Sequence, residues 1–537
     1  MNRVRSRTTR TPESTEAWIL GSGPASLASA LYLVQHAKLP ASNVHILDCH
    51  DSMEQVVHHT GDTTHGYDLL AGCLPFPVGE PLKELLASVP SPRGEGYMVL
   101  DEIKSSEARK GYAKTTRRTR FMIGKDGKLD YFPTKSLGLS PKNRLDLIRF
   151  LCKGERRMGR RRIQELLPKS FFQSTFWAIW TAQFGFQPWH SAIEFKRAIR
   201  QYLGRHHGLS ILNCLDLTGY YRYESIYVSI FLYLQGLGVD FHFDTLVTGI
   251  TMTSQDGKDR VSQLDLIENG FQSQKSIDAQ DIIIITLGST ISGTATGTNE
   301  SPPLLDFTNL EGELNENWVL WLEIGDQSPK FGNPYNFCTR QFESLMGSFT
   351  ITTRDPRLHG ILESLTNGIT DDGIFISVPD SPWKLNLCSP AQPVVNQQPQ
   401  NLRVMWGFAV YPRRSGSFVN KPMKACSGAE ILTELFKHLD FPLSTQQTVA
   451  TPRVMPRMWA MLLARSSTDR PTPIPLSTTN IGLVGPFVDI PHFTCVDPSY
   501  DVRTAEMAVS NLMDLPMSKP RDKNQPILDM LRLLFWK

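Results

Sequence analysis

The sequence predicts an α/β protein whose parallel sheet is assembled from segments that lie far apart in the chain. Three observations support this fold class. A buried-strand pattern at 17–20 runs through a glycine-containing turn into a helix of small residues. A second apolar segment, "NVHILD", follows soon afterwards. Two further buried-strand patterns, at 281–289 and 480–491, return to the same sheet after long helical and mixed insertions.

The turn after the first strand has the form of a dinucleotide-binding motif, Gly21-x-Gly23-x-x-Ser26. Gly21 permits the tight turn, and Gly23 lets the backbone approach a pyrophosphate at the helix N-terminus. Asp48 ends the second strand, where an acid binds the ribose hydroxyls of an adenosine. The alternative is an ordinary strand–turn–helix with no ligand. The order strand, turn, helix, strand and acid favours the dinucleotide site.

A second glycine and acid stand at the end of the last buried strand, as Gly485 and Asp489. This arrangement is typical of two-part flavin domains, so we predict a Rossmann-type fold that binds FAD, with both residues near the flavin. The predicted organisation in chain order is a disordered tail at 1–15, the first part of the FAD-binding Rossmann domain at 16–137, a helical substrate-domain region at 138–236, FAD-domain return strands at 237–300, a substrate domain at 301–400, FAD-domain closure at 401–515, and a linker with an amphipathic C-terminal helix at 516–537.

Composition excludes several classes of function. The chain has 537 residues and a formal net charge of +3, which gives no support to a role in binding nucleic acid. Its eight cysteines are scattered, with no CxxC pair and no metal-ligand spacing, which favours a reducing compartment and no metal site. No apolar run reaches the roughly 18 residues that span a bilayer. The basic N-terminus lacks the apolar core of a secretory signal, so we expect a cytoplasmic protein.

Motifs spread over nearly the whole chain resemble those of one family. They include "LGSGPASLASALYL", "FWAIWTAQFGFQPWHSAIE", "YYRYESI", "KPMKACSGAEILTELFKHL" and "FVDIPHFTCVDPSYDVRTA". On these motifs the sequence resembles the flavin-dependent oleate hydratases, also called myosin-cross-reactive antigens. The resemblance implies a flavin fold with a fatty-acid tunnel and an enzyme that hydrates an isolated cis double bond. It also implies that the flavin mainly shapes the site, because the reaction has no net redox change.

The positions that carry the chemistry of this family differ here. Alignment on the shared motifs places Leu74 where the family has the catalytic Glu that activates water, and Ala198 where it has the Tyr that protonates the alkene. The carboxylate-binding positions of the family hold Arg222, Cys388, Pro390 and Val394. A general acid and a general base each contribute roughly 10²–10⁴-fold to a rate. We therefore expect altered chemistry in place of ordinary hydration.

Several other side chains are candidates for a replacement site. The planar guanidinium of Arg222 suits a carboxylate, a phosphate or a carrier thioester, and its alternative role is a structural ion pair. His59 and Tyr220 are weak candidates for an acid or a base. Cys73 lies in the loop that aligns with the catalytic one, but nothing near it in sequence lowers the pKa of a thiol. We expect His190 to be a packing and hydrogen-bonding residue.

Two classes of function fit these observations. The first is a flavin enzyme that acts on an unsaturated lipid-like or polyketide-like substrate, by altered hydration, isomerisation or redox chemistry. The second is a non-catalytic descendant that binds FAD and lipid. An ordinary fatty-acid hydratase remains a third reading if the alignment is displaced. In each case the partner is a hydrophobic small molecule.

The C-terminal segment 526–537 predicts a peripheral membrane contact. It places five apolar residues on one helical face: Ile527, Leu528, Leu531, Leu534 and Phe535. Such a helix can lie in a membrane interface, and the alternative is packing on the protein's own core or on a second subunit of a homodimer. We predict reversible binding to vesicles that is stronger when they are anionic. Co-sedimentation of the full chain and of a chain that ends at Gln525 tests this, and equal pelleting of the two would exclude the contact.

Overall fold

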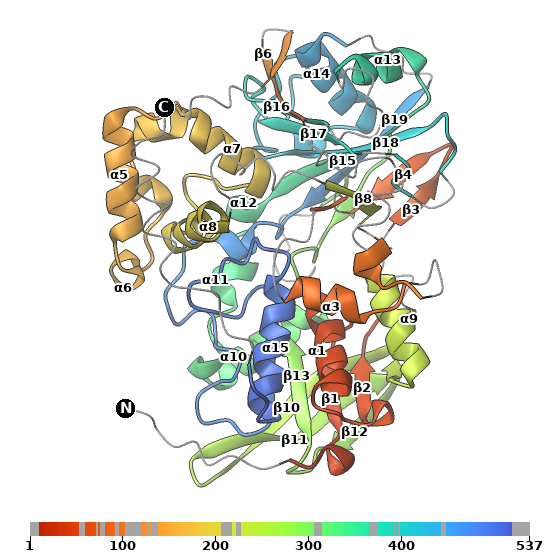
Figure 1. Ribbon diagram of the computed structural model, residues 1–537, viewed down its shortest axis with the longest axis vertical. Helices are drawn as coiled ribbons and strands as arrows, with labels where there is room; N and C mark the ends of the chain where they lie inside the picture. The colour runs from red at the N-terminus through yellow and green to blue at the C-terminus, as the bar shows by residue number, and fades with distance from the viewer. Residues whose placement is uncertain are drawn as a thin grey trace.

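The structure is a computed structural model with two sheets, one above the other along the long axis, and a helical region beside the upper sheet (Figure 1). The residues that it describes are 10–52, 59–70, 73–75, 81–91, 96–102, 120–125, 128–131, 138–205, 217–221, 227–305, 314–365, 374–390, 392–395, 398–441 and 447–517. Among them, no helix is long and apolar enough to cross a membrane.

The lower sheet has five strands in the order β20-β13-β1-β2-β9, and all its neighbours are parallel. Its strands are β1 (Ala17–Leu20), β2 (Val44–Leu47), β9 (Asp240–His242), β13 (Ile282–Thr286) and β20 (Ile481–Val484). The strand order reverses between β1 and β13, which is the topological switch point of a doubly wound sheet. The predicted Rossmann-type fold built from distant segments is therefore confirmed.

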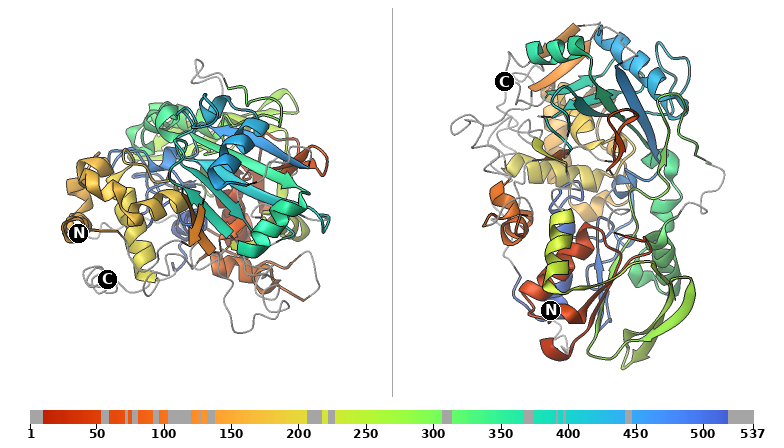
Figure 2. Two further views of the ribbon diagram at one scale, coloured as in Figure 1. Left: turned by 90° about the horizontal axis from the view of Figure 1, so that it is seen from above. Right: turned by 90° about the vertical axis from the view of Figure 1, so that its right-hand side faces the viewer.

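Alternate residues of β1 face opposite layers. Ala17 and Ile19 pack against the helices α1 (Pro24–Gln35), α3 (Leu82–Ser88), α9 (Val228–Leu237) and α15 (Tyr500–Leu512). Trp18 and Leu20 pack against an antiparallel sheet of β10 (Thr245–Gln255), β11 (Lys258–Glu268) and β12 (Phe271–Ser276). The right-hand view of Figure 2 shows the helices on one side and this sheet on the other. Both faces of the parallel sheet are covered, which explains why β1, β13 and β20 are buried along their whole length and almost wholly apolar.

The upper sheet has eight strands in the order β14-β19-β15-β18-β17-β16-β6-β7. Its strands are β6 (Arg120–Lys125), β7 (Lys128–Tyr131), β14 (Ala295–Thr296), β15 (Met346–Thr353), β16 (Ile374–Val378), β17 (Leu385–Ser389), β18 (Arg403–Ala409) and β19 (Thr448–Met455). Three segments that we expected in the FAD-binding domain supply strands to this sheet: β6 and β7, β14, and β18 with β19. An alternating strand pattern gives a strand's buried face but not the sheet it joins, and the chain returns to the lower sheet only at β20.

The remaining strands form two short pairs, β3 (His59–Asp62) with β4 (Gly66–Leu69), and β5 (Cys73–Pro75) with β8 (Leu217–Tyr221). Hydroxyl side chains cap three of the helices: Ser140 for α5, Ser174 for α7 and Ser427 for α14. The helices not yet given are α5 (Pro141–Cys152), α6 (Glu155–Met158), α7 (Thr175–Phe184), α8 (Ala192–Arg205), α10 (Glu316–Gln327), α11 (Tyr335–Cys338), α12 (Gln341–Ser344), α13 (Pro356–Leu365) and α14 (Gly428–Leu439).

A buried ion cluster joins the helical region to the segment that leads into and out of β20. The carboxylate of Glu194, on α8, is fully buried, and its Oε1 lies 2.9 Å from Arg465 Nη2 and 3.3 Å from Arg470 Nη1. Asp489 Oδ1 lies 2.8 Å from both Arg465 Nη2 and Arg197 Nη1. Burial disfavours the charge of Glu194, but Arg470, Arg197 and Arg465 outweigh it and hold its pKa below the usual range.

Loss of the Glu194 charge is expected to destabilise the whole protein. Glu194→Ala leaves buried guanidinium groups without their shared carboxylate, and breaking a buried pair in this way costs about 3–5 kcal/mol. Thermal unfolding of the variant measures the loss. Asp146→Asn is the control, because the exposed pair between Asp146 and Arg149 spans 3.4 Å on the surface of α5 and is worth at most about 1 kcal/mol. Equal melting temperatures for the two variants would contradict a central role for the cluster.

Candidate functional site

The turn between β1 and α1 is built for close approach of a ligand to the backbone. Gly21 has φ +95°, and a Cβ on it would lie 3.2 Å from Asn317 Oδ1, so both conformation and space require glycine. Gly23 has an ordinary extended backbone, with φ −68° and ψ 177°. A Cβ on Gly23 would meet no atom of the described residues within 4 Å. Neither conformation nor packing explains this second glycine, whereas the pyrophosphate of a dinucleotide at the α1 N-terminus does.

Ser26 lies one helical turn further on and is fully buried. Its hydroxyl is 2.7 Å from the hydroxyl of Thr286, at the end of β13. This bond holds α1 close to the strand on the far side of the switch point. Ser26 therefore contributes to the geometry of the predicted site through helix–strand packing, and a direct contact with the cofactor stays a prediction.

Asp48 immediately follows β2, and its carboxylate is bonded to the glycine turn. Oδ2 accepts from the backbone N–H of Ser22 at 2.8 Å, and Oδ1 accepts from the backbone N–H of His50 at 2.9 Å. Oδ1 also lies 2.6 Å from His50 Nδ1. Burial disfavours the carboxylate charge, but these bonds outweigh it and hold the pKa of Asp48 below its usual range. The predicted ribose ligand thus lies beside the turn, as expected, but is already heavily bonded.

Gly485 and Asp489 follow β20 and have different surroundings. Gly485 has φ +100°, and its N–H donates to Thr504 Oγ1 on α15 at 3.0 Å. It lies at the same carboxyl edge of the sheet as Gly21 and Asp48, where a doubly wound fold binds ligands. Asp489 instead forms the ion pairs with Arg197 and Arg465. Its predicted proximity to the flavin stays a prediction.

Two residues of this edge were missed by sequence reasoning. Asn317 belongs to the first turn of α10 and reaches Gly21 from a segment that is remote in the chain. No local pattern could indicate that contact. His50 stands two residues after the predicted ribose acid, and a histidine so close to that acid was a usable signal.

Two groups of side chains have atoms close enough to share a metal ion, within 4.8 Å of one another: His45 with Asp240 and His242, and Asp48 with Cys49 and His50. In the first group Asp240 Oδ2 lies 2.8 Å from His45 Nδ1 and 2.7 Å from His242 Nε2. These are hydrogen-bond distances, and they account for the arrangement without a metal.

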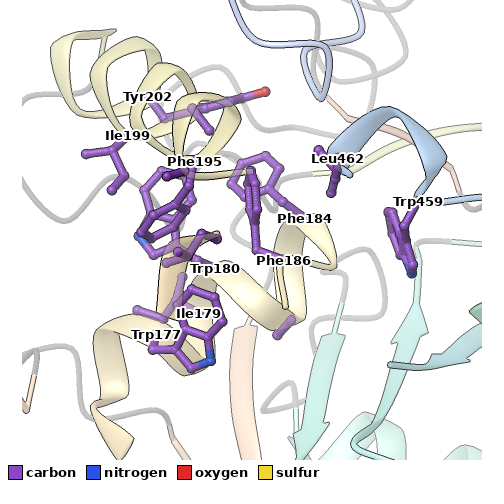
Figure 3. Close-up of a cluster of buried hydrophobic side chains, with 14 of the residues drawn as sticks. Trp177, Ile179, Trp180, Phe184, Phe186, Phe195, Ile199, Tyr202, Trp459 and Leu462 are labelled. Carbon is purple, nitrogen blue, oxygen red and sulfur yellow. The ribbon is translucent and has the colours of Figure 1, made fainter. Parts of the chain in front are cut away.

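The positions expected to carry substrate chemistry lie in packed cores. Ala198 is fully buried on α8, in a cluster rich in aromatic rings. Figure 3 shows its neighbours on the helix, Phe195 and Tyr202, among the rings of α7. Phe195 has its ring centroid 5.7 Å from that of Trp180, and Tyr202 has its centroid 4.6 Å from that of Phe184.

The positions aligned with carboxylate ligands are also buried. Cys388, on β17, belongs to the same cluster as Ala198 and is 4% exposed. Val394 packs in a smaller cluster with Tyr67 and Leu69 of β4. Pro390, just after β17, is buried too. Packing alone accounts for the apolar character of these positions.

His190 is a buried structural histidine, as expected. Its Nδ1 accepts from the backbone N–H of Gln187 at 3.2 Å, and its Nε2 lies 3.3 Å from the carbonyl oxygen of Glu343. Burial lowers the pKa of His190 to about 3, so the ring is neutral at physiological pH. A neutral imidazole with a hydrogen bond at each ring nitrogen fixes the loop before α8.

The structure brings together two of the candidate segments. β5 and β8 are antiparallel, with Cys73 opposite Tyr221 and Pro75 opposite Leu217. Leu74 and Tyr220 therefore belong to neighbouring strands, whereas His59 begins β3 in a separate pair. Arg222 and the C-terminal segment 526–537 lie outside the described residues.

The sequence profile of the MCRA family matches residues 14–510. This chain belongs to the MCRA family. The resemblance found from the motifs is therefore confirmed.

Two curated relatives match the MCRA chain along most of its length. An oleate hydratase of Streptococcus pyogenes serotype M49 (strain NZ131) is 26% identical over 558 residues, which cover 98% of this chain and 91% of the relative. A linoleate hydratase of Lactiplantibacillus plantarum is 24% identical over 547 residues, which cover 94% of each chain. At these identities the chain is a diverged member.

Two solved structures are also similar to it. An oxidoreductase from Methanosarcina mazei has a TM-score of 0.48 at 11% identity and covers 91% of this chain and 99% of its own. A fatty acid isomerase from P. acnes has a TM-score of 0.40 at 11% identity and covers 92% of this chain and 98% of its own.

The dinucleotide turn of this MCRA protein can be tested by a substitution that closes the approach to its backbone. Gly23→Val puts a branched side chain where the pyrophosphate is expected, so stoichiometric FAD should be lost while the fold remains. Flavin absorbance per protein chain and thermal melting measure both effects. Gly236→Val on α9 is the control, because a Cβ there also meets nothing within 4 Å. Retention of FAD by the Gly23 variant would place the nucleotide elsewhere.

Proposed function

We propose that this MCRA protein binds FAD and acts on an unsaturated, lipid-like substrate by chemistry other than ordinary alkene hydration. The observation that supports chemistry other than hydration is the burial of Ala198. The position that aligns with the family's proton donor has a methyl group, is fully buried, and is surrounded by aromatic side chains. The finer identification of the substrate, lipid-like or polyketide-like, rests on the apolar character of this region.

The residues at the carboxyl edge fit FAD. The α1 N-terminus and the backbone of Gly23 would hold the pyrophosphate, the region of Asp48 the adenosine ribose, and Gly485 would allow close approach near the flavin. The flavin, when bound, supplies a ring system that can accept or donate electrons or shape the substrate site. The residues that would hold it lie at the carboxyl ends of β1, β2 and β20, which meet at one edge of the parallel sheet.

The expected loss of hydration follows from magnitudes. The family's Glu and Tyr positions are Leu74 and Ala198, and neither leucine nor alanine exchanges a proton. Removal of a general base and a general acid, each worth roughly 10²–10⁴-fold, leaves little of the original rate. Cys388, Pro390 and Val394 provide no charged or strongly polar group for a fatty-acid carboxylate either.

A non-catalytic FAD- and lipid-binding role is the second candidate. It is favoured by the same burial, because every aligned substrate position that is described with its side chain packs as core. The two roles differ in the behaviour of the flavin. A yellow protein whose colour bleaches with a nicotinamide donor supports redox chemistry, whereas a flavin that no reductant or unsaturated lipid perturbs supports the binding role.

Purified protein supplied with FAD and oleate is expected to form hydroxystearate much more slowly than is typical of the family, if at all. The measurement is mass spectrometry of the fatty-acid fraction, with an oleate hydratase run alongside as the positive control. Flavin content is determined on the same sample, so that an inactive result refers to loaded protein. Robust turnover would show that the alignment of Leu74 or Ala198 is displaced and that the protein is an ordinary fatty-acid hydratase.

A further inference from the structure

The pair formed by Asp48 and His50 occupies the place where a Rossmann-type site receives the adenosine ribose. In the simple form of such a site, the acid after the second strand accepts hydrogen bonds from the ribose hydroxyls. Here the acid has a histidine bonded to it from two residues further along the chain. The backbone and the ring of His50 both contact the same carboxylate oxygen, at 2.9 Å and 2.6 Å.

The carboxylate of Asp48 is buried and already accepts three hydrogen bonds. Oδ2 accepts from the N–H of Ser22, and Oδ1 accepts from the backbone and the ring of His50. The Asp48 side chain is only 5% exposed, whereas that of His50 is 35% exposed. Among the described residues, His50 Nε2 has no hydrogen-bond partner. The accessible polar atom at the end of β2 therefore belongs to the histidine.

We propose that His50 Nε2 is the atom that binds the ribose hydroxyl of the dinucleotide, and that Asp48 positions the imidazole. This inference rests on the proposed dinucleotide site. With Nδ1–H donated to Asp48, Nε2 is left to bond a ribose hydroxyl, as an acceptor when the ring is neutral and as a donor when it is protonated. The arrangement is like the one in which a carboxylate orients a histidine through one nitrogen and leaves the other for a ligand.

The charges around His50 define the class of nucleotide. The ring is bonded to Asp48, and the negative charges of Glu316 and Asp51 also act on it; Cys49 lies beside it, with Sγ 3.9 Å from Nδ1. The hydrogen bond that His50 Nδ1–H donates to Asp48 outweighs burial and raises the pKa of His50 above its usual value. Three acids around one imidazole disfavour an added phosphate on the ribose. The site therefore suits a dinucleotide with free ribose hydroxyls, such as FAD, and not a ribose that carries a phosphate.

The test compares two nucleotides that differ by one ribose hydroxyl. ADP and dADP are titrated against the full chain with FAD bound, and displacement is followed by flavin fluorescence. Wild type should prefer ADP by about five- to ten-fold, the contribution of one hydrogen bond. His50→Ala should reduce that preference to about two-fold or less and weaken FAD binding by a similar factor. His50→Phe keeps the ring volume without its nitrogens and should give the same loss.

His65→Ala is the matched control. His65 also has its Nδ1 bonded to an aspartate, at 2.8 Å from Asp62 Oδ2, but it is 83% exposed on the turn between β3 and β4. Its removal should leave the preference for ADP unchanged. If His50→Ala and His50→Phe fold and keep the wild-type preference, Asp48 binds the ribose directly and the inference is wrong.

The result for Gly23→Val separates this failure from that of the proposed function. If Gly23→Val loses FAD while the His50 variants keep the preference, the dinucleotide site stands and only the role of His50 is overturned. If Gly23→Val retains FAD, the nucleotide lies elsewhere, and the site and the role of His50 are overturned together.

Discussion

The buried carboxylate of Glu194 is the constraint on which the placement of the helical region relative to the carboxyl edge of the parallel sheet depends. It lies on α8, one helical turn before Ala198 and on the same side of the helix, and two of its arginine partners, Arg465 and Arg470, come from the segment that leads to β20. A buried charge tolerates little displacement, because each unpaired ion costs several kcal/mol. Arg465 of the same cluster also forms an ion pair with Asp489, just after β20. These ion pairs therefore fix the position of the helical region relative to the carboxyl edge of the parallel sheet.

The dinucleotide edge depends on a different kind of constraint, the order of the strands. β1, β2, β13 and β20 come from widely separated segments, yet their parallel pairing puts all their carboxyl ends at one edge. Sterically required glycine at 21 and a buried bond between Ser26 and Thr286 then fix α1 against that edge. Precise placement of the turn is thus a property of the sheet, and so is the open space above Gly23.

The sequence allowed these elements to be predicted because each carries a local signal. The glycine turn, the apolar strands and the acid after β2 need only a few neighbouring residues to be read, and all lie where expected. The pairing of β18 and β19 with β15 had no local signal, because each resembles any half-buried strand until its partner is known. Asn317 beside Gly21 and the arginines around Asp489 were equally beyond reach, because each contact joins residues far apart in the chain.

The apolar residue at position 198, which aligns with the family's tyrosine, is also constrained by the packing around it. At 198, a tyrosine would add a ring and a hydroxyl to a cluster in which Trp180, Phe184 and Phe195 already pack closely. Overpacking of this kind typically costs about 1–3 kcal/mol, and a buried hydroxyl also needs a partner. Cys388 in the same cluster faces the same restriction. A tyrosine at position 198 would therefore require further substitutions among its neighbours in this cluster.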